Sequence, residues 1–252
     1  ALTLLEMGEP FKQRNRQLLR GYLLVADESL DQFAPAEREL YTQNQQLRSS
    51  LQQYQRTQND HLQHLARSHT QQQLIVRLAR QRYTSSDPQQ EAAELITQAA
   101  CEVYGVARAG IWKLGGHHLD SVSLYRRDLD RHEQLPSINA RNFPQYLQAL
   151  HSGRAIDAHD AQHDPRTCEL AASYLQPYGI HSLLDASIRI EGEVVGILCL
   201  EHIGPKRIWQ ADEIAFAGEL ADQFAQVLIN QQKRDVTSTL NLFQRAVEQS
   251  AS

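Results

Sequence analysis

A long stretch without glycine or proline is the feature that most constrains this chain of 252 residues. Residues 36–87 contain neither of the two residue types that most readily interrupt a helix. Proline is tolerated in the first turn of a helix, so we predict that a helix begins near Pro35. At about 1.5 Å per residue, an unbroken helix of this length would exceed roughly 60 Å. A helix that long cannot bury itself against one small domain.

The apolar residues of this stretch follow a heptad-like track. It comprises Leu51, Leu62, Leu65, Val76, Ala79 and Tyr83, and it is interrupted by Gln55, Gln58, His69 and Gln72. Polar residues in such a seam weaken a coiled coil, but they set its register and partner number. The pattern favours a parallel signalling helix over residues 36–86 that dimerises, and the alternative is a solvated linker helix. We expect residues 1–35 to form a separate helical segment.

A second unit begins at Asp87, and strand hairpins dominate it. Asp87 precedes Pro88, which places an N-cap residue before a first-turn proline, and apolar residues at helical spacing follow as far as Gly105. Strand-like runs at 106–114 and 119–125 are separated by two glycines, and runs at 182–190 and 193–202 are separated by Glu191-Gly192.

Helical patterns alternate with these hairpins. They cover residues 143–150, a segment from Asp164-Pro165 to just before Pro177, and a last helix that starts near Gln210 and continues past Arg234. Residues 154–157 have the pattern of a short edge strand. We therefore predict an α/β (α+β) fold, with a central antiparallel sheet of about six strands flanked by helices.

Composition argues against several classes of function. The formal net charge is -5, and no Lys/Arg stripe with interleaved aromatic residues marks a nucleic-acid interface. No run approaches the roughly 18 apolar residues of a membrane-spanning helix, and the N-terminus does not resemble a signal peptide. Three scattered cysteines, Cys101, Cys168 and Cys199, are typical of reduced thiols in a cytoplasmic protein. Because the sequence starts without Met and stops inside a helical pattern, we expect a piece of a longer polypeptide.

The order of elements and several short motifs resemble the GAF family over residues 87–232. The residues that carry the resemblance are Asp157-Ala158-His159-Asp160, Asp164-Pro165-Arg166-Thr167, Tyr174-Leu175, and the runs 179–185, 192–202 and 207–217. Domains of this family are antiparallel sheets with helices on both faces, and they usually serve as small-molecule sensors and dimerisation modules. Residues 242–250 look like the entry helix of a PAS domain, which would make 233–252 a linker helix between two sensors.

The resemblance implies a ligand pocket over the sheet, enclosed by residues 143–185. The candidate ligand-binding residues in that segment are Tyr146, Asp157, His159, Asp160, Arg166, Thr167, Tyr174, Tyr178, Ser182 and Asp185. A few directed polar groups on an apolar wall are what small-molecule recognition requires. The structural alternative is that Asp164 only caps a helix, and that Arg166 pairs with Asp157 or Asp160 to hold the loop.

No metal, cofactor or catalytic machinery is expected. His159 and His163 are four residues apart, but Pro165 lies between them and Cys168, so one helical face does not present all three. The cyclic-nucleotide signature of the family is absent, because Trp209 precedes Asp212-Glu213 by only two residues. No Cys-His pair stands where phytochrome-type members attach a bilin.

We therefore expect a non-catalytic sensory module that relays ligand binding through dimeric helices at both ends of the domain to a downstream output domain. Output of a cyclic-di-nucleotide or histidine-kinase type would suit such a module. The first alternative is a dimerisation or spacer module without a ligand. A remote alternative is a methionine sulfoxide reductase, which would need an accessible thiolate of low pKa.

Overall fold

The computed structural model describes residues 35–250 and divides the chain into two compact units, Ala1–His64 and Leu65–Ser252. The helical segment predicted before Pro35 lies outside the described residues. Helix α2 (Pro35–Arg80) begins where the sequence predicts, but it ends before Asp87. The backbone N–H groups of Thr84 and Ser85 instead donate to the Glu91 carboxylate, each at 3.1 Å. This contact holds the connection between α2 and the next helix.

Helix α3 (Pro88–Tyr104) has the predicted boundaries because residues next to it in the sequence cap both of its ends. Asp87 Oδ1 accepts the N–H groups of Gln89 and Gln90, both at 3.1 Å. At the other end Gly105 adopts φ 63°, the left-handed conformation that favours glycine.

An antiparallel sheet forms the centre of the second unit, as predicted. The strand order is β3-β2-β1-β7-β6-β5, and a short β4 pairs with β2. The strands are β1 (Arg108–Gly115), β2 (His118–Arg126), β3 (Arg131–Glu133), β4 (Ile138–Asn139), β5 (Ala155–Ala158), β6 (Ile180–Ile190) and β7 (Glu193–Ile203). The two predicted hairpins, β1–β2 and β6–β7, meet through the β1–β7 pairing. The sequence did not indicate β3 and β4, because two or three residues are too few to show alternation.

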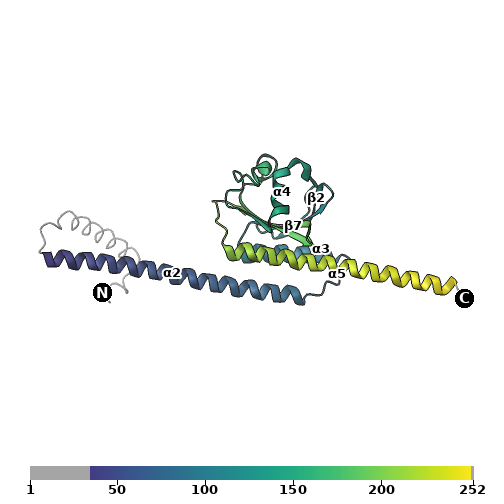
Figure 1. Ribbon diagram of the computed structural model, residues 1–252, viewed down its shortest axis with the longest axis horizontal. Coiled ribbons are helices and arrows are strands. Elements are labelled where there is room, and N and C mark those ends of the chain that lie inside the picture. The colour runs from purple at the N-terminus through teal and green to yellow at the C-terminus, as the bar shows by residue number, and fades with distance from the viewer. Residues whose placement is uncertain (1–34, 251–252) are drawn as a thin grey trace. The chain divides into compact units, whose positions relative to one another are not determined.

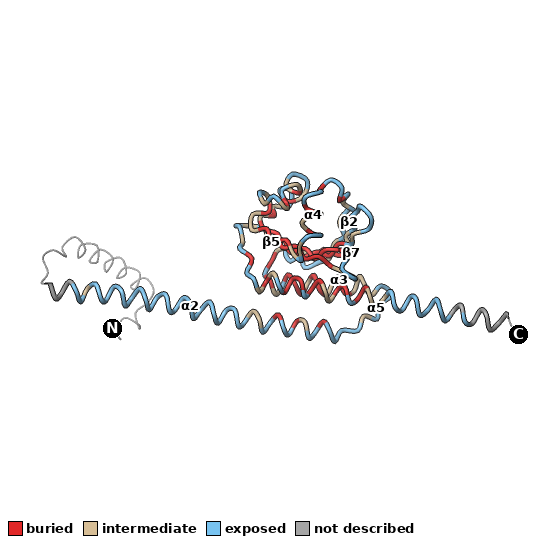
Figure 2. Tube along the Cα trace, viewed as in Figure 1, coloured by how far each residue is buried: buried red, intermediate tan, exposed pale blue. Residues whose placement is uncertain are grey.

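Helices cover both faces of the sheet (Figure 1). Helices α3 and α5 (Ala211–Ser250) lie against one face, and α4 (Pro144–Ser152) lies against the other. Alternation along β6 separates the two cores: Leu184 and Ala186 belong to the cluster with α3 and α5, whereas Leu183 belongs to the opposite one. Figure 2 shows the resulting concentration of buried residues in the sheet and on the helices beneath it.

The segment predicted as a helix from Asp164 to Pro177 is not a regular α-helix. Asp164 Oδ1 accepts the backbone N–H of Arg166 at 2.9 Å, so the chain first makes a turn. A 3-10 turn η4 (Cys168–Leu170) and a π-helical turn η5 (Ala171–Leu175) follow. Turns of the π type are rare and often mark functional sites.

The last turns of α2 belong to the second unit. Leu74 and Leu78 are buried in the cluster that holds α3 and α5, and Arg67 Nε pairs with Asp212 Oδ2 at 3.1 Å. Tyr83 follows the end of α2, so it does not extend the predicted heptad track. Among the described residues, no helix has the length and apolar character that crossing a membrane requires.

Candidate functional site

A small cavity lies on the α4 side of the sheet. Its volume is about 30 Å³, enough for one or two water molecules. Its polar groups come from Tyr146, Tyr174, Asp185, Cys199 and Glu201. The rest of the wall is apolar or aromatic and consists of Trp112, Leu119, Ile138, Leu170, Leu183 and Ile197. No basic residue lines it among the residues that the structure describes.

Asp185 is the most unusual group in the cavity wall. Its residue is 1% exposed, and its Oδ2 accepts the Tyr146 hydroxyl, which reaches it from α4. Its other oxygen, Oδ1, is buried and accepts no N–H or O–H group. Burial raises the pKa of Asp185 to about 7, although hydrogen bonds from Tyr146 and from the weakly donating Cys199 thiol lower it in part.

A second buried cluster adjoins the cavity through Tyr174 and Glu201, which both line it. Arg108 Nε and Glu201 Oε2 are 2.6 Å apart, with side chains 4% and 1% exposed. The Tyr174 hydroxyl bridges this ion pair: it accepts from Arg108 Nη2 at 2.8 Å and donates to Glu201 Oε1 at 2.6 Å. The Tyr178 ring covers the Arg108 guanidinium, 4.4 Å from Cζ to the ring centroid. Glu201 is thus neutralised within the protein, unlike Asp185.

Strand pairing explains why these groups meet. Arg108 on β1 lies opposite Glu201 on β7, and Asp185 on β6 lies opposite Cys199. The side chains of Asp185 and Cys199 therefore share the face of the sheet under α4. The π-helical turn η5 supplies Tyr174 from above.

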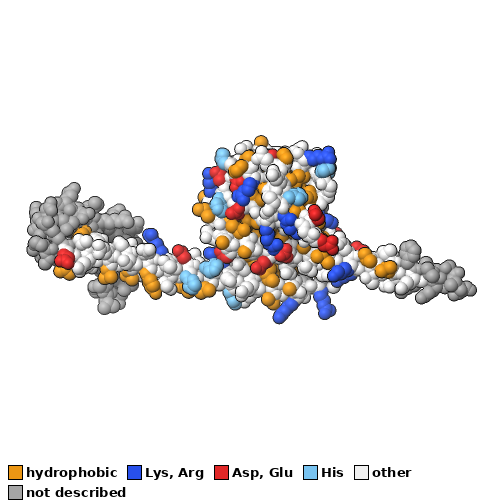
Figure 3. All heavy atoms as spheres, viewed as in Figure 1, with side chains coloured by type: hydrophobic (Ala, Val, Ile, Leu, Met, Phe, Trp, Pro, Cys, Tyr) orange, Lys and Arg blue, Asp and Glu red, His pale blue; other side chains and the backbone are white. Residues whose placement is uncertain are grey.

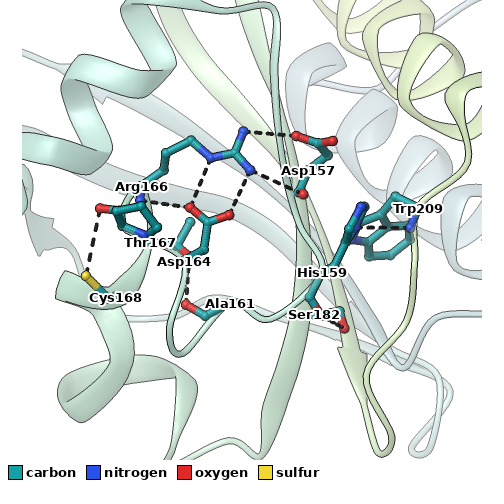
Figure 4. Close-up of polar contacts among 10 residues, drawn as sticks. Asp157, His159, Ala161, Asp164, Arg166, Thr167, Cys168, Ser182 and Trp209 are labelled. Carbon is teal, nitrogen blue, oxygen red and sulfur yellow. Dashed lines mark hydrogen bonds and ion pairs between the residues drawn. The ribbon is translucent and has the colours of Figure 1, made fainter.

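Most of the polar residues between Asp157 and Ser182 form a network outside the cavity (Figure 4). Arg166 pairs with Asp157 at 2.9 Å and with Asp164 at 2.8 Å. Thr167 Oγ1 donates to the Ala161 carbonyl at 2.7 Å. These bonds hold the loop between β5 and η4, which is the structural alternative that the sequence left open for Arg166.

The remaining loop residues join that network to the start of α5. Ser182 Oγ donates to the His159 carbonyl at 2.8 Å, and the backbone N–H of Trp209 donates to His159 Nδ1 at 3.3 Å (Figure 4). Asp160 pairs with Lys206 and, at 3.0 Å, with His163. The loop is therefore fastened to the strands and to the entry of α5.

The ten predicted binding residues fall into three places. Tyr146, Tyr174 and Asp185 line the cavity. Tyr178 stands behind Arg108, and the other six belong to the loop network: Asp157, His159, Asp160, Arg166, Thr167 and Ser182. None of these contacts tests ligand binding, so the roles of all ten stay predictions.

Sequence reasoning did not single out Arg108, Trp112, Cys199 or Glu201 as part of the site. The available signal was a charged residue inside each of two strand-like runs, Arg108 between two alanines and Glu201 after Leu200. A charge in a buried strand requires a partner, but sequence alone does not identify it.

Two of the three cysteine thiols are buried, and the third is exposed. Burial raises the pKa of Cys101 to about 12 and also raises that of Cys199, so neither is a thiolate near neutral pH. Cys168 is exposed, and its Sγ lies 3.8 Å from the Pro165 carbonyl oxygen. Within residues 35–250, no group of three or more His, Cys, Asp or Glu side chains is arranged to hold a metal ion.

Solved structures share this fold at low sequence identity. The blue-light absorbing form of the Thermosynechococcus elongatus PixJ GAF domain is 20% identical, with a TM-score of 0.51 over 60% of this chain and 91% of its own. The GAF domain of an Acinetobacter phosphoenolpyruvate-protein phosphotransferase is 11% identical, with a TM-score of 0.51 over 65% and 93% of the two chains. The bacteriophytochrome RpBphP3 from R. palustris is 12% identical, with a TM-score of 0.52 over 68% and 38%.

The family assignment rests on the sequence as well as the fold. No curated protein matches the chain significantly. The model of the GAF domain family matches residues 88–228, more than half of the chain and nearly the span that the motifs indicated. GAF domains are generally non-catalytic sensory domains of photoreceptors and signalling proteins. On this match and this fold, the chain belongs to the GAF domain family.

Proposed function

We propose that this chain is a non-catalytic sensor that binds a small molecule in the cavity over the sheet. The observation that supports it best is Asp185 Oδ1, a buried acceptor without an N–H or O–H donor, at the wall of that cavity. An unsatisfied buried polar group destabilises a fold by about 1–3 kcal/mol. A domain that only held its neighbours apart would be more stable with an apolar residue here.

The relay begins at the strand that carries Asp185. Leu184 and Ala186, on either side of it, pack into the core under α3 and α5. A ligand that displaces Asp185 therefore shifts the residues on which both helices rest. The Tyr104 hydroxyl of α3 donates to the Glu213 carbonyl at 2.7 Å, so the two helices move together. Since α5 reaches Ser250, the displacement would leave the domain along that helix.

The proposed partner is a second copy of this chain, bound through its terminal helices. Apolar side chains are exposed at intervals along α2 (Figure 3), and Leu51, Leu62, Leu65 and Val76 are each at least half exposed. Val236 and Leu240 on α5 are also exposed. The face of α2 used within the domain is a different one, that of Leu74 and Leu78, so the predicted heptad track is available to a partner helix.

The dimer is tested by sedimentation of the full chain with a matched pair of variants. Leu62→Glu places a charge on the track, and Gln63→Glu places the same charge one position away. We expect Leu62→Glu to shift the chain to monomer and Gln63→Glu to leave the dimer intact. A wild-type chain that sediments as a monomer at micromolar concentration would exclude this partner.

The second candidate function is a spacer that binds nothing, and the size of the cavity favours it. Small-molecule pockets usually measure about 300–1,000 Å³, whereas this one is about 30 Å³ and is narrowed by the rings of Tyr146 and Tyr174. For the sensor, the irregular η4–η5 segment that carries Leu170 and Tyr174 must move when the ligand enters.

Native mass spectrometry of the purified chain, followed by extraction of small molecules, separates the two candidates. A stoichiometric adduct that Cys199→Leu removes, by filling the cavity with a larger side chain, would support the sensor. If the wild-type chain carries no adduct and a metabolite screen by thermal shift finds no ligand, the sensor is contradicted. In that case Cys199→Leu should only stabilise the domain. The cytoplasmic location, the output domain and the PAS start at residues 242–250 remain predictions.

A further inference from the structure

The charge of the cavity wall restricts what can bind there. Two carboxyl groups, Asp185 and Glu201, line the cavity, and none of the described lining residues is basic. Arg108 is committed to Glu201 and lies behind it, with Tyr174 bridging the pair. An anionic ligand would therefore lie beside a buried carboxyl group, and no basic residue of the wall would neutralise the ligand. The wall suits a positive ligand.

The hydrogen-bonding capacity of the wall points the same way. Asp185 Oδ1 is a free acceptor, while its Oδ2 already accepts the Tyr146 hydroxyl. A ligand that satisfies Oδ1 of the ionised Asp185 carboxylate must present an N–H or O–H donor. Charge-assisted bonds to a carboxylate are the stronger kind, at roughly 1.5–3 kcal/mol.

The rest of the wall favours a flat apolar body. Trp112, Tyr146 and Tyr174 present aromatic rings, and Trp112 and Tyr174 meet edge to face with centroids 6.5 Å apart. Aromatic faces attract cations, most strongly when water is excluded. Leu170 and Tyr174 belong to the irregular η4–η5 segment, so one of the three rings that would contact the ligand, that of Tyr174, lies on the part of the wall with the least regular backbone.

From these features we propose that the cavity takes a small organic cation, a flat apolar body bearing an amidinium, guanidinium or protonated nitrogen heterocycle whose N–H groups donate to Asp185. This inference rests on the proposed sensor function and names its ligand class. Entry of such a cation would displace Tyr174 from its bridge between Arg108 and Glu201. The ion pair would remain, because its 2.6 Å contact does not depend on the hydroxyl.

The test uses three probes of nearly equal shape and different charge: benzamidine, benzamide and benzoate. The full chain is prepared with isotope-labelled tryptophan, which gives one indole NMR signal for Trp112 at the cavity and one for Trp209 in the opposite core. The Trp209→Phe variant assigns the two signals. Titration of each probe then reports binding at the cavity through the Trp112 signal.

We expect benzamidine to shift the Trp112 signal and to bind at least tenfold more tightly than benzamide or benzoate. Asp185→Asn should weaken benzamidine at least tenfold, the loss expected for one charge-assisted hydrogen bond. Asp120→Asn is the matched control, because it removes one negative charge from an exposed position on β2.

Three results would overturn the inference, and they have different consequences for the sensor. Equal binding of benzamide or benzoate would exclude selection of a cation, and unchanged benzamidine binding by Asp185→Asn would exclude Asp185 as the group that binds it. Either of these two results would leave a ligand-binding cavity. If none of the three probes shifts the Trp112 signal at millimolar concentration, the cation class is excluded, and the adduct search by native mass spectrometry then decides the sensor function separately.

Discussion

Replacing Asp185 with asparagine tests the electrostatic argument on which the site depends. Burial raises the pKa of this carboxyl to about 7 in the folded protein, whereas an unfolded aspartate has a pKa of about 3.9. The folded protein therefore holds this proton more tightly than the unfolded chain does. The stabilisation is fully present below about pH 4, and it is lost as the pH rises through about 7.

The size of the effect follows from the two pKa values. A difference of about three units corresponds to roughly 4 kcal/mol, which is an upper limit because the buried site can relax. Asparagine has the same shape and does not titrate. Between about pH 4 and pH 8, the free energy of unfolding of the wild type should therefore fall relative to Asp185→Asn by up to about 4 kcal/mol.

The groups that face Asp185 do not obscure the measurement. Burial raises the pKa values of Tyr146 on α4 and Cys199 on β7 well above their usual range, so both stay neutral below pH 8. Glu201 on β7 also faces it and is paired with Arg108. Burial lowers the pKa values of His132 and His202, so their contributions to the free energy of unfolding are lost as the pH falls. Both histidines are present in the wild type and in Asp185→Asn, so their contributions cancel when the two free energies of unfolding are subtracted.

Urea unfolding followed by tryptophan fluorescence is the assay, at pH values from about 4 to 8.5. Trp112 and Trp209 are the two tryptophans of the chain, and they lie in the two separate cores of the domain, so the signal reports on the whole sheet. Asp120→Asn serves as the exposed control and should run parallel to the wild type. If Asp185→Asn also runs parallel, the carboxyl is ionised throughout and the desolvation argument is wrong.

Three further substitutions test the packing around the site. Glu201→Gln leaves the Arg108 charge buried without a counter-ion. We expect it to lower the free energy of unfolding by about 3–5 kcal/mol. A loss below about 1 kcal/mol would contradict the stabilising role of the ion pair. Gly196→Ala would place a Cβ 2.5 Å from the Trp112 carbonyl oxygen. The urea midpoint should therefore fall by the equivalent of about 1–3 kcal/mol. An unchanged midpoint would refute the close approach of β7 to β1 at this position. Asp87→Ala removes the N-cap of α3 and should destabilise the domain by about 1 kcal/mol, whereas an unaltered thermal midpoint would show that the cap is dispensable.

Local rules determined the outline of this protein from its sequence. The start of α2 at Pro35, the cap at Asp87, and the hairpin turns at Gly116-His117, one residue past the predicted Gly115-Gly116, and at Glu191-Gly192 each depend on residues that are neighbours in the chain. Turn and cap preferences act over four or five residues, so they can be recognised without a structure. The order of these elements predicted the antiparallel sheet, and together with the short motifs between residues 157 and 217 it gave the resemblance to the GAF family.

The site itself depended on contacts between distant parts of the chain. Pairing of β1 with β7 sets Arg108 opposite Glu201, and packing of α4 on the sheet brings Tyr146 to Asp185. Strand register and the side chains of other elements decide which face of a strand is buried. They also decide which pairs of charged residues come into contact. Sequence reasoning therefore named three residues of the cavity wall but also six that hold a loop beside it, because both groups are polar, lie between the same elements and differ only in what the fold packs against them.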